Sequence, residues 1–239
     1  MRMKSPFLVA AVAPLCIMKG MRDNLVIRPY RAGDRAVVRE ICRGTADRGR
    51  ALPKKGPDGE LVADLVTGYY TDIDARWNWV AEDGGRVIGY LTAAIDTRVF
   101  RRAKAWRIVP GAVIRALCRG FLVSRAFGSL VKAFVRRRGL NVMPVYSLPE
   151  RYPAHIHINL LDGYRGRGLG PRLMAASISQ LEAGNVSGVH ATVRADNPEA
   201  CRFFERMGFT VIDGYGVVMP CEGGTQDVRI LVYGRRLAA

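Results

Sequence analysis

Disulfide patterns, membrane-length apolar runs and repeats are all missing from this 239-residue sequence. No apolar run approaches the roughly twenty residues that span a bilayer, and no internal repeat or low-complexity tract is present. The five cysteines are odd in number and form no CxxC pair, which disfavours a disulfide framework or a zinc site. We therefore expect a cytoplasmic protein of ordinary globular composition, long enough to bury a core.

Acidic residues are missing from two stretches of the chain. Residues 1–22 hold four basic residues and no acid, and residues 97–149 hold twelve basic residues and no acid. These stretches account for the net charge of +16, because the rest of the chain carries twenty-one residues of each sign. We expect residues 1–20 to be an N-terminal extension and residues 21–239 to be a single domain with an insertion at 97–149.

The N-terminal stretch has an alternative interpretation as a secretory signal. Its apolar part is broken by Pro14, which directly follows the only Ala-x-Ala at Ala11–Ala13. Proline is unsuitable after a cleavage site, so an extension outside the fold is favoured.

The rest of the chain alternates between strand and helix patterns. Period-two or short apolar runs predict strands at 25–30, 77–82, 86–96, 154–161, 188–193, 209–213 and 227–233. Helical spacing predicts helices at 35–42, 59–67, 168–183 and 198–207, with Asp34 and Asn197 as N-caps. The chain is therefore a mixed α/β protein with more strands than helices.

The basic insertion shows apolar residues at helical spacing over Val109–Val135, with Gly120 and Gly128 as expected breaks and a loop at 143–153. We favour a helical cap with most of its aromatics on the apolar stripe and its arginines toward water. The second interpretation is binding of an anionic membrane surface through residues 98–138. Capture of an acidic acceptor or of nucleic acid ranks third, since aromatics on an apolar stripe do not suit base stacking.

The segment Gly163–Met174 joins a predicted strand to a predicted helix through a loop rich in glycine and arginine. A helix N-terminus offers unpaired N–H groups, and glycines let the backbone approach an anion, so the loop can cradle phosphate with charge from Arg165 and Arg167. A nucleoside-triphosphate loop is excluded, and a GxGxxG fingerprint fails at Pro171. A tight turn without a ligand is the alternative.

Two segments carry a resemblance to a known family. Arg165–Gly170 resembles the R/Q-x-x-G-x-G/A signature of the GNAT superfamily of acyl-CoA N-acyltransferases. Asn197–Phe209 is similar to that family's N-x-x-A-x-x-F-Y-x-x-x-G-F segment. The resemblance covers residues 25–96 and 150–235, and it extends to a bacterial subgroup akin to the acetyltransferase-like domain of O-GlcNAcases.

The resemblance implies a GNAT-like mixed α/β fold: a mostly antiparallel central sheet flanked by helices, with the helical basic insertion between the third and fourth strands. It implies acetyl-CoA or another acyl-CoA as co-substrate, and direct transfer to the primary amine of a small molecule or peptide. No metal is expected. The donor-binding residues it implies are Leu160, Leu161, Arg165, Gly166, Arg167, Gly168, Leu169, Gly170, Asn197 and Phe204.

The catalytic residues are less well defined. His155 and His157 share one face of the predicted strand with Asn159, and histidine suits proton transfer from an amine. Structural histidines are the equal alternative, and a metal site with His190 is a weaker one.

Two positions depart from the family pattern. Phe204 replaces a tyrosine that can protonate the leaving thiolate, and Asn159 cannot act as a base. Cys201 and Tyr215 are candidate substitutes. A non-catalytic acyl-CoA-binding module is therefore the second hypothesis, and an adaptor acting through the basic insertion is the third.

Overall fold

The computed structural model describes residues 24–46, 49, 59–118, 151–221 and 224–238. Seven strands form one sheet in the order β1-β2-β3-β4-β5-β7-β6. Only β4 and β5 pair in parallel; the other neighbouring pairs are antiparallel. The predicted mixed, mostly antiparallel sheet is confirmed. The strands are β1 Leu25–Pro29, β2 Trp79–Asp83, β3 Arg86–Ala94, β4 Ala154–Leu160, β5 Gly188–Arg194, β6 Thr210–Cys221 and β7 Gly224–Arg236.

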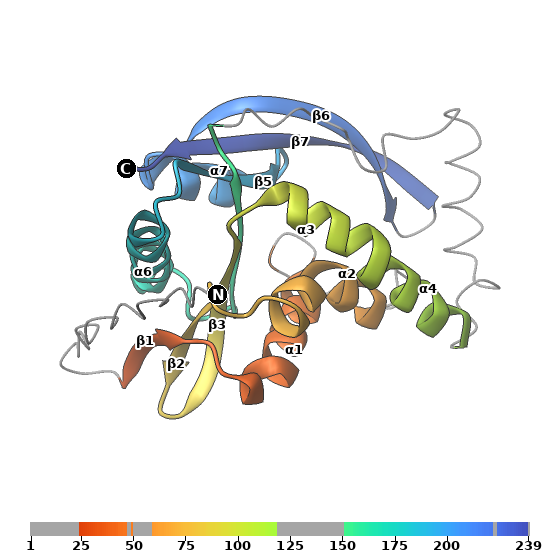
Figure 1. Cartoon of the computed structure of the whole chain (residues 1–239), viewed down its shortest axis with the longest axis horizontal. Coiled ribbons are helices and arrows are strands. Elements are labelled where there is room, and N and C mark those ends of the chain that lie inside the picture. Colours follow the sequence, from red (N-terminus) through yellow and green to blue (C-terminus); the bar gives the residue numbers. More distant parts are fainter. Residues whose placement is uncertain (1–23, 47–48, 50–58, 119–150, 222–223, 239) are drawn as a thin grey trace, which may run out of the picture.

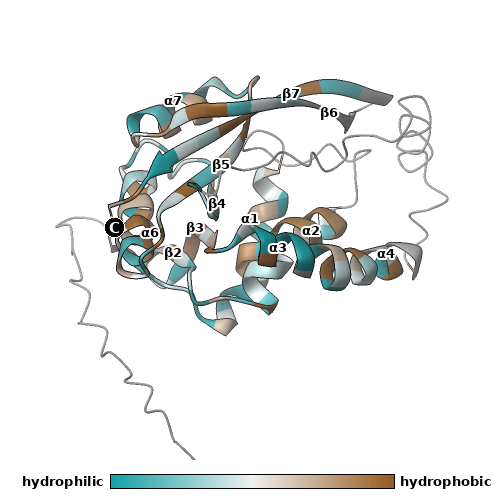
Figure 2. Cartoon of the chain, turned by 45° about the horizontal axis from the view of Figure 1, so that its top comes forward, coloured by the Kyte–Doolittle hydropathy of each residue, from teal (hydrophilic) through white to brown (hydrophobic). Residues whose placement is uncertain are grey.

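Helices cover both faces of the sheet (Figures 1 and 2). Leu173 and Leu181 of α6 belong to the main core cluster, whereas Val38 of α1 packs with Val80 and Tyr90 on the opposite face. This division follows from the alternation of side chains along β2 and β3. The helical segments are the 3₁₀ turn η1 Ala32–Asp34, α1 Arg35–Thr45, α2 Gly59–Asp72, α3 Thr97–Ala103, the π-helical turn η2 Lys104–Ile108, α4 Val109–Cys118, α6 Leu169–Ala183 and α7 Pro198–Arg206.

The two predicted helix caps have different outcomes. The Asn197 side chain accepts a hydrogen bond from the Ala200 N–H at 3.2 Å, which confirms that cap. Asp34 precedes α1, but its carboxylate caps no N–H of that helix. It accepts instead from the Arg31 N–H at 2.7 Å and pairs with Arg28 at 2.8 Å, because the 3₁₀ turn directs it back toward β1.

The described part of the insertion is helical and runs between β3 and β4 along α2 (Figure 1). Phe100, Ile108 and Ala112 are buried, whereas Trp106 is 78% exposed and is an exception to the expectation that most aromatics follow the apolar stripe. The reason is η2: a π-helical turn adds a residue and changes which side chains face the core. The predicted helices beyond Cys118 and the loop at 143–153 lie outside the described residues.

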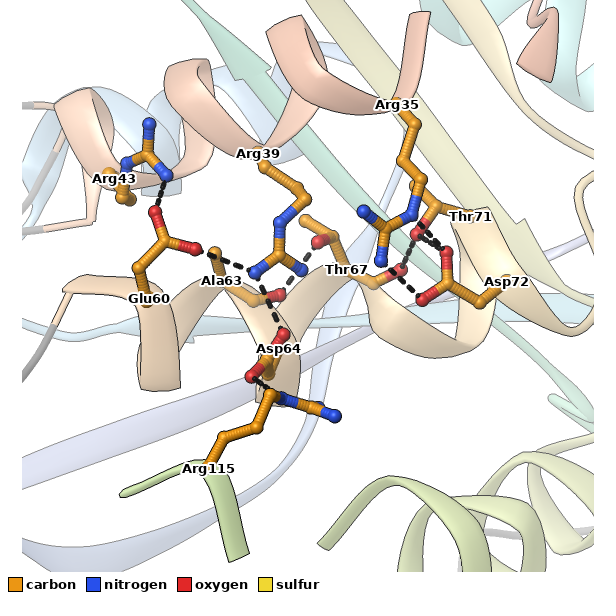
Figure 3. Close-up of polar contacts among 10 residues, drawn as sticks. All are labelled: Arg35, Arg39, Arg43, Glu60, Ala63, Asp64, Thr67, Thr71, Asp72 and Arg115. Carbon is orange, nitrogen blue, oxygen red and sulfur yellow. Dashed lines mark hydrogen bonds and ion pairs between the residues drawn. The ribbon is translucent and has the colours of Figure 1, made fainter. Parts of the chain in front are cut away.

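A network of charged side chains ties this insertion to α1 and α2 (Figure 3). Arg39 is buried between Glu60 and Asp64, at 2.9 and 2.8 Å, and Arg115 of α4 also reaches Asp64 at 2.8 Å. Half of the Arg115 side chain is exposed, so it faces water as expected while it also pairs with Asp64. Asp64 is only 5% exposed, and a buried carboxylate needs cationic partners to offset its desolvation.

No helix within the described ranges is long and apolar enough to cross a bilayer.

Candidate active site

Strand β4 separates from β5 soon after the two strands meet. Their parallel pairing is confined to Ala154 with Val189 and His155 with His190. Beyond that point β4 continues to pair with β3 as far as Leu160, and β5 continues to pair with β7. Among the described residues, the β5-facing edge of β4 therefore has no neighbouring strand from Ile156 onward, and its backbone can accept an amide-containing ligand.

The loop between β4 and α6 follows directly on this open edge. Gly163, Gly166 and Gly168 have φ between +74° and +79°, and Gly168 is the N-cap of α6. A side chain at such a φ costs about 1–2 kcal/mol, so these positions favour glycine. With the unpaired N–H groups of the first helical turn, this bare backbone can accept an anion beside the edge of β4.

Gly170 has a different role from the glycines before it. It lies inside α6, and a Cβ there would be 3.0 Å from Cε2 of Phe203 on α7. This glycine allows the two helices to pack closely, and its expected backbone contact with phosphate stays a prediction.

The two loop arginines point in different directions. The Arg165 guanidinium donates to the carbonyl of Gly49 at 2.7 Å and to that of Leu160 at 3.3 Å. Arg165 thus ties the loop to the segment after α1, and its charge is already engaged by the backbone. Arg167 is exposed and lies over the Tyr164 ring at 5.2 Å, which leaves it accessible to an anion. A phosphate contact of Arg167 stays a prediction.

The two predicted catalytic histidines lie on the α1/α2 side of β4. The His155 Nδ1 is 2.6 Å from the Tyr70 hydroxyl, and its ring stacks on Phe100 and lies 5.0 Å from that of His190. Burial is the main cause that holds the pKa of His155 well below its usual value of 6.5, and the charges of His190, His157 and Lys104 act in the same direction. His155 is therefore a neutral, firmly packed side chain.

His157 is held by a chain of polar contacts to the core. Asn159 Nδ2 lies 3.1 Å from His157 Nε2 and 2.9 Å from the Tyr90 hydroxyl, so its two hydrogens can serve both. In that arrangement Nε2 of His157 accepts and Nδ1 carries the proton. Burial, assisted by the charge of Lys104, lowers the pKa of His157 to about 4. The ring is therefore neutral at pH 7, and its one acceptor nitrogen, Nε2, faces the Asn159 amide.

The chain can now be compared with known proteins. The family model of the acetyltransferase (GNAT) family matches residues 53–209. The chain belongs to the GNAT acetyltransferase family. It is 26% identical to protein O-GlcNAcase of Rattus norvegicus over 88% of this chain and 22% of that protein. It is 25% identical to mycothiol acetyltransferase of Corynebacterium diphtheriae over 69% of this chain and 51% of that protein.

The chain thus spans about a fifth of the length of the O-GlcNAcase it matches. Solved structures agree on the GNAT fold. The protein SsHAT has a TM-score of 0.64 at 24% identity, over 90% of this chain and all of that one. A phosphinothricin acetyltransferase from Sinorhizobium meliloti, solved with AcCoA, has a TM-score of 0.52 at 16% identity, over 90% and 89% of the chains.

Two other predicted donor-binding residues of this GNAT chain, Leu161 and Phe204, already have partners within the protein. The Leu161 N–H donates to the Ile88 carbonyl and its own carbonyl accepts from Tyr164, so its backbone is already occupied. The expected pairing of a ligand at Leu161 stays a prediction. Phe204 is 5% exposed and stacks on Tyr233 in the core, where its ring serves packing. Contacts of Leu160, Leu169, Asn197 and Phe204 with a donor stay predictions.

The candidate substitutes for the missing tyrosine are not brought to the histidines. The Cys201 thiol contacts the Arg194 carbonyl at 3.8 Å, and Tyr215 lies on β6, the outer strand of the sheet. His190 Nδ1 lies 3.0 Å from the Tyr152 carbonyl, to which it donates. Across the described residues, no group of three or more His, Cys, Asp or Glu side chains could hold a metal ion.

Sequence reasoning missed Tyr70, Tyr90 and Lys104 as neighbours of the histidines. Tyr90 is the cross-strand partner of Asn159, but the two residues lie 69 positions apart on either side of the insertion. Only the register between β3 and β4 brings them together, and no local pattern in the sequence gives that register.

Proposed function

We propose that this chain transfers an acetyl group from acetyl-CoA to a primary amine, which attacks the thioester directly. The observation that carries the proposal is the separation of β4 from β5 beside the glycine cradle at the start of α6. The pantetheine amides would pair with the open edge of β4, and the pyrophosphate would lie on the N–H groups around Gly168. The AcCoA-bound relative with the same fold supports this choice of donor.

The histidines on the same strand supply the remaining chemistry. An amine that attacks a carbonyl becomes positively charged and must lose a proton. Nδ1 of the neutral His157 ring already carries a proton, so the amine's proton would go to Nε2 once the Asn159 amide turns away from it. Asn159 and Tyr90 orient that ring. Holding the amine and the thioester together on one strand supplies the proximity that direct transfer requires.

Replacement of His157 tests this role. We expect His157→Ala to lower kcat by about 100-fold or more, the usual contribution of a general base, without weakening acetyl-CoA binding. Thiol release from acetyl-CoA measures the first quantity across a panel of amines, and calorimetry measures the second.

The matched control is Cys118→Ala, which removes an exposed side chain at the end of α4. Unchanged turnover in His157→Ala would show that the histidine is structural. If acetyl-CoA binds and no amine in the panel releases thiol from the wild-type protein, the chain is a non-catalytic acyl-CoA-binding module instead.

A membrane-surface role is a second candidate, favoured by one exposed patch. Val99 is 55% and Trp106 is 78% exposed, and both line a shallow depression of about 340 Å³ together with Arg102 and Arg107. An exposed tryptophan among arginines suits the interface of an anionic bilayer. The remainder of the predicted surface, beyond Cys118, lies outside the described residues. A cytoplasmic location stays a prediction from the cysteine pattern.

Vesicle binding tests this second role. We expect Trp106→Ala to reduce cosedimentation with vesicles containing phosphatidylglycerol by several-fold, because the indole is the largest apolar group of the patch. Val211→Ala is the matched control, since Val211 is also exposed but lies on β6. Equal binding to neutral phosphatidylcholine vesicles, or none to either kind, would rule out the membrane role.

A further inference from the structure

Lys104 is a cation turned toward the protein, unlike the arginines around it. It follows Phe100 by four residues, so the two side chains lie on the same side of the helical segment. Phe100 is buried against His155, and the Lys104 ammonium lies 5.6 Å from the centre of the Phe100 ring. Lys104 is half-buried, whereas Arg102 and Arg107 are exposed. Its charge is therefore directed at the site.

This ammonium has no carboxylate beside it in the described part of the chain. Residues 97–149 contain no acid, and no described carboxylate forms an ion pair with Lys104. The groups that feel its charge are His155 and His157, and both are neutral. Burial lowers the pKa of Lys104 below its usual 10.5. A desolvated cation without a counter-charge is unfavourable, and a bound anion would offset that cost.

We propose that Lys104 binds the carboxylate of the acceptor, so that the acceptor is a primary amine that also carries a carboxylate. The inference rests on the proposed acetyl transfer and names the acceptor class for that site. If Lys104 binds the acceptor carboxylate, the rest of the acceptor lies beside His155 and His157. Both histidines are on β4, whose β5-facing edge is open to the donor. Lys104 thereby selects the acceptor and positions its amine.

The experiment compares ω-amino acids of increasing length with their carboxamides as acceptors. We expect the wild-type protein to favour the best carboxylate over its carboxamide by about 10- to 100-fold in kcat/KM, the range of a hydrogen bond to a charged group. Lys104→Met should abolish that preference, mainly through KM. Lys104→Arg should retain most of it, and Arg107→Met, on the exposed side, should retain all of it.

Two results would overturn the proposal: no preference for carboxylates in the wild-type protein, or a preference that persists in Lys104→Met. Calorimetric titration of the ω-amino acids into the CoA-saturated protein separates this proposal from the proposed function. Binding that depends on Lys104 without any thiol release from acetyl-CoA would keep the anion site and reject the transfer. Acetylation of carboxamides and carboxylates alike, independent of Lys104, would keep the transfer and reject the anion site.

Discussion

Gly168→Glu is expected to weaken acetyl-CoA binding by at least about 100-fold. Gly168 has a φ of +77° at the N-cap of α6, so any side chain there costs about 1–2 kcal/mol of backbone strain. A glutamate also brings a negative charge to the N–H groups that we expect to hold the pyrophosphate. Repulsion between the carboxylate and the pyrophosphate weakens the binding free energy further. No other atom lies within 4 Å of the new Cβ, so steric clash is not the cause.

Two variants at the same position separate strain from charge. Gly168→Ala carries the strain alone, and we expect about a tenfold loss of affinity. Gly168→Lys carries the strain and the bulk of a long side chain with the opposite charge, and its affinity should exceed that of Gly168→Glu by tenfold or more. Titration calorimetry with CoA measures all three. Equal affinities for the glutamate and lysine variants would mean that no phosphate binds at this loop.

The elements of this fold could be predicted wherever the signal is local. The turn at Asp83–Gly85, the Asn197–Pro198 start of α7 and the helical spacing of α6 each lie within a few residues, and all three are confirmed. The glycine loop was predicted for the same reason, since both its conformation and its helix start are local.

The surroundings of the histidines could not be predicted, because they depend on contacts between distant segments. Tyr70 and His155 are 85 residues apart, and Arg165 and Gly49 are 116 residues apart. The direction of Arg165 illustrates the consequence. Its position in the glycine loop indicated a phosphate ligand, whereas its guanidinium donates to the Gly49 carbonyl, which no local pattern places beside it. Trp106 was misplaced for a local reason, because a π-helical turn leaves no mark in the apolar spacing.

Acid is expected to destabilise this chain steeply between pH 7 and pH 5. The sequence contains three histidines, and all of them have pKa values well below the unfolded value of about 6.5: about 4 for His157 and His190, and a lowered value for His155. Burial is the main cause for each. Below pH 6.5 the unfolded chain takes up protons that the native chain does not, so the free energy of unfolding falls as the pH falls.

The effect is large relative to the stability of a domain. His157 and His190 each contribute up to about 2 kcal/mol of destabilisation by pH 5, so the two together approach about 4 kcal/mol, against a typical total of about 5–15 kcal/mol. His155 acts in the same direction. Carboxylates act in a lower window. The pKa of Asp72 lies below its usual 3.8, chiefly through its hydrogen bond with Arg35, so the stability that it provides is lost only at more acidic pH. The histidines therefore account for the loss above pH 5.

His190→Asn tests the assignment at the most deeply buried of the three. His190 is 1% exposed and bonds through Nδ1 to the Tyr152 carbonyl, and an asparagine amide can donate to the same carbonyl without titrating. Urea unfolding at pH values from 8 to 5 gives the free energy of unfolding as a function of pH. In the variant this free energy should depend on pH less steeply by about one proton, or about 1.4 kcal/mol per pH unit at its steepest. A wild-type stability that is constant from pH 8 to pH 5, or an unchanged slope in the variant, would show that the histidines titrate normally.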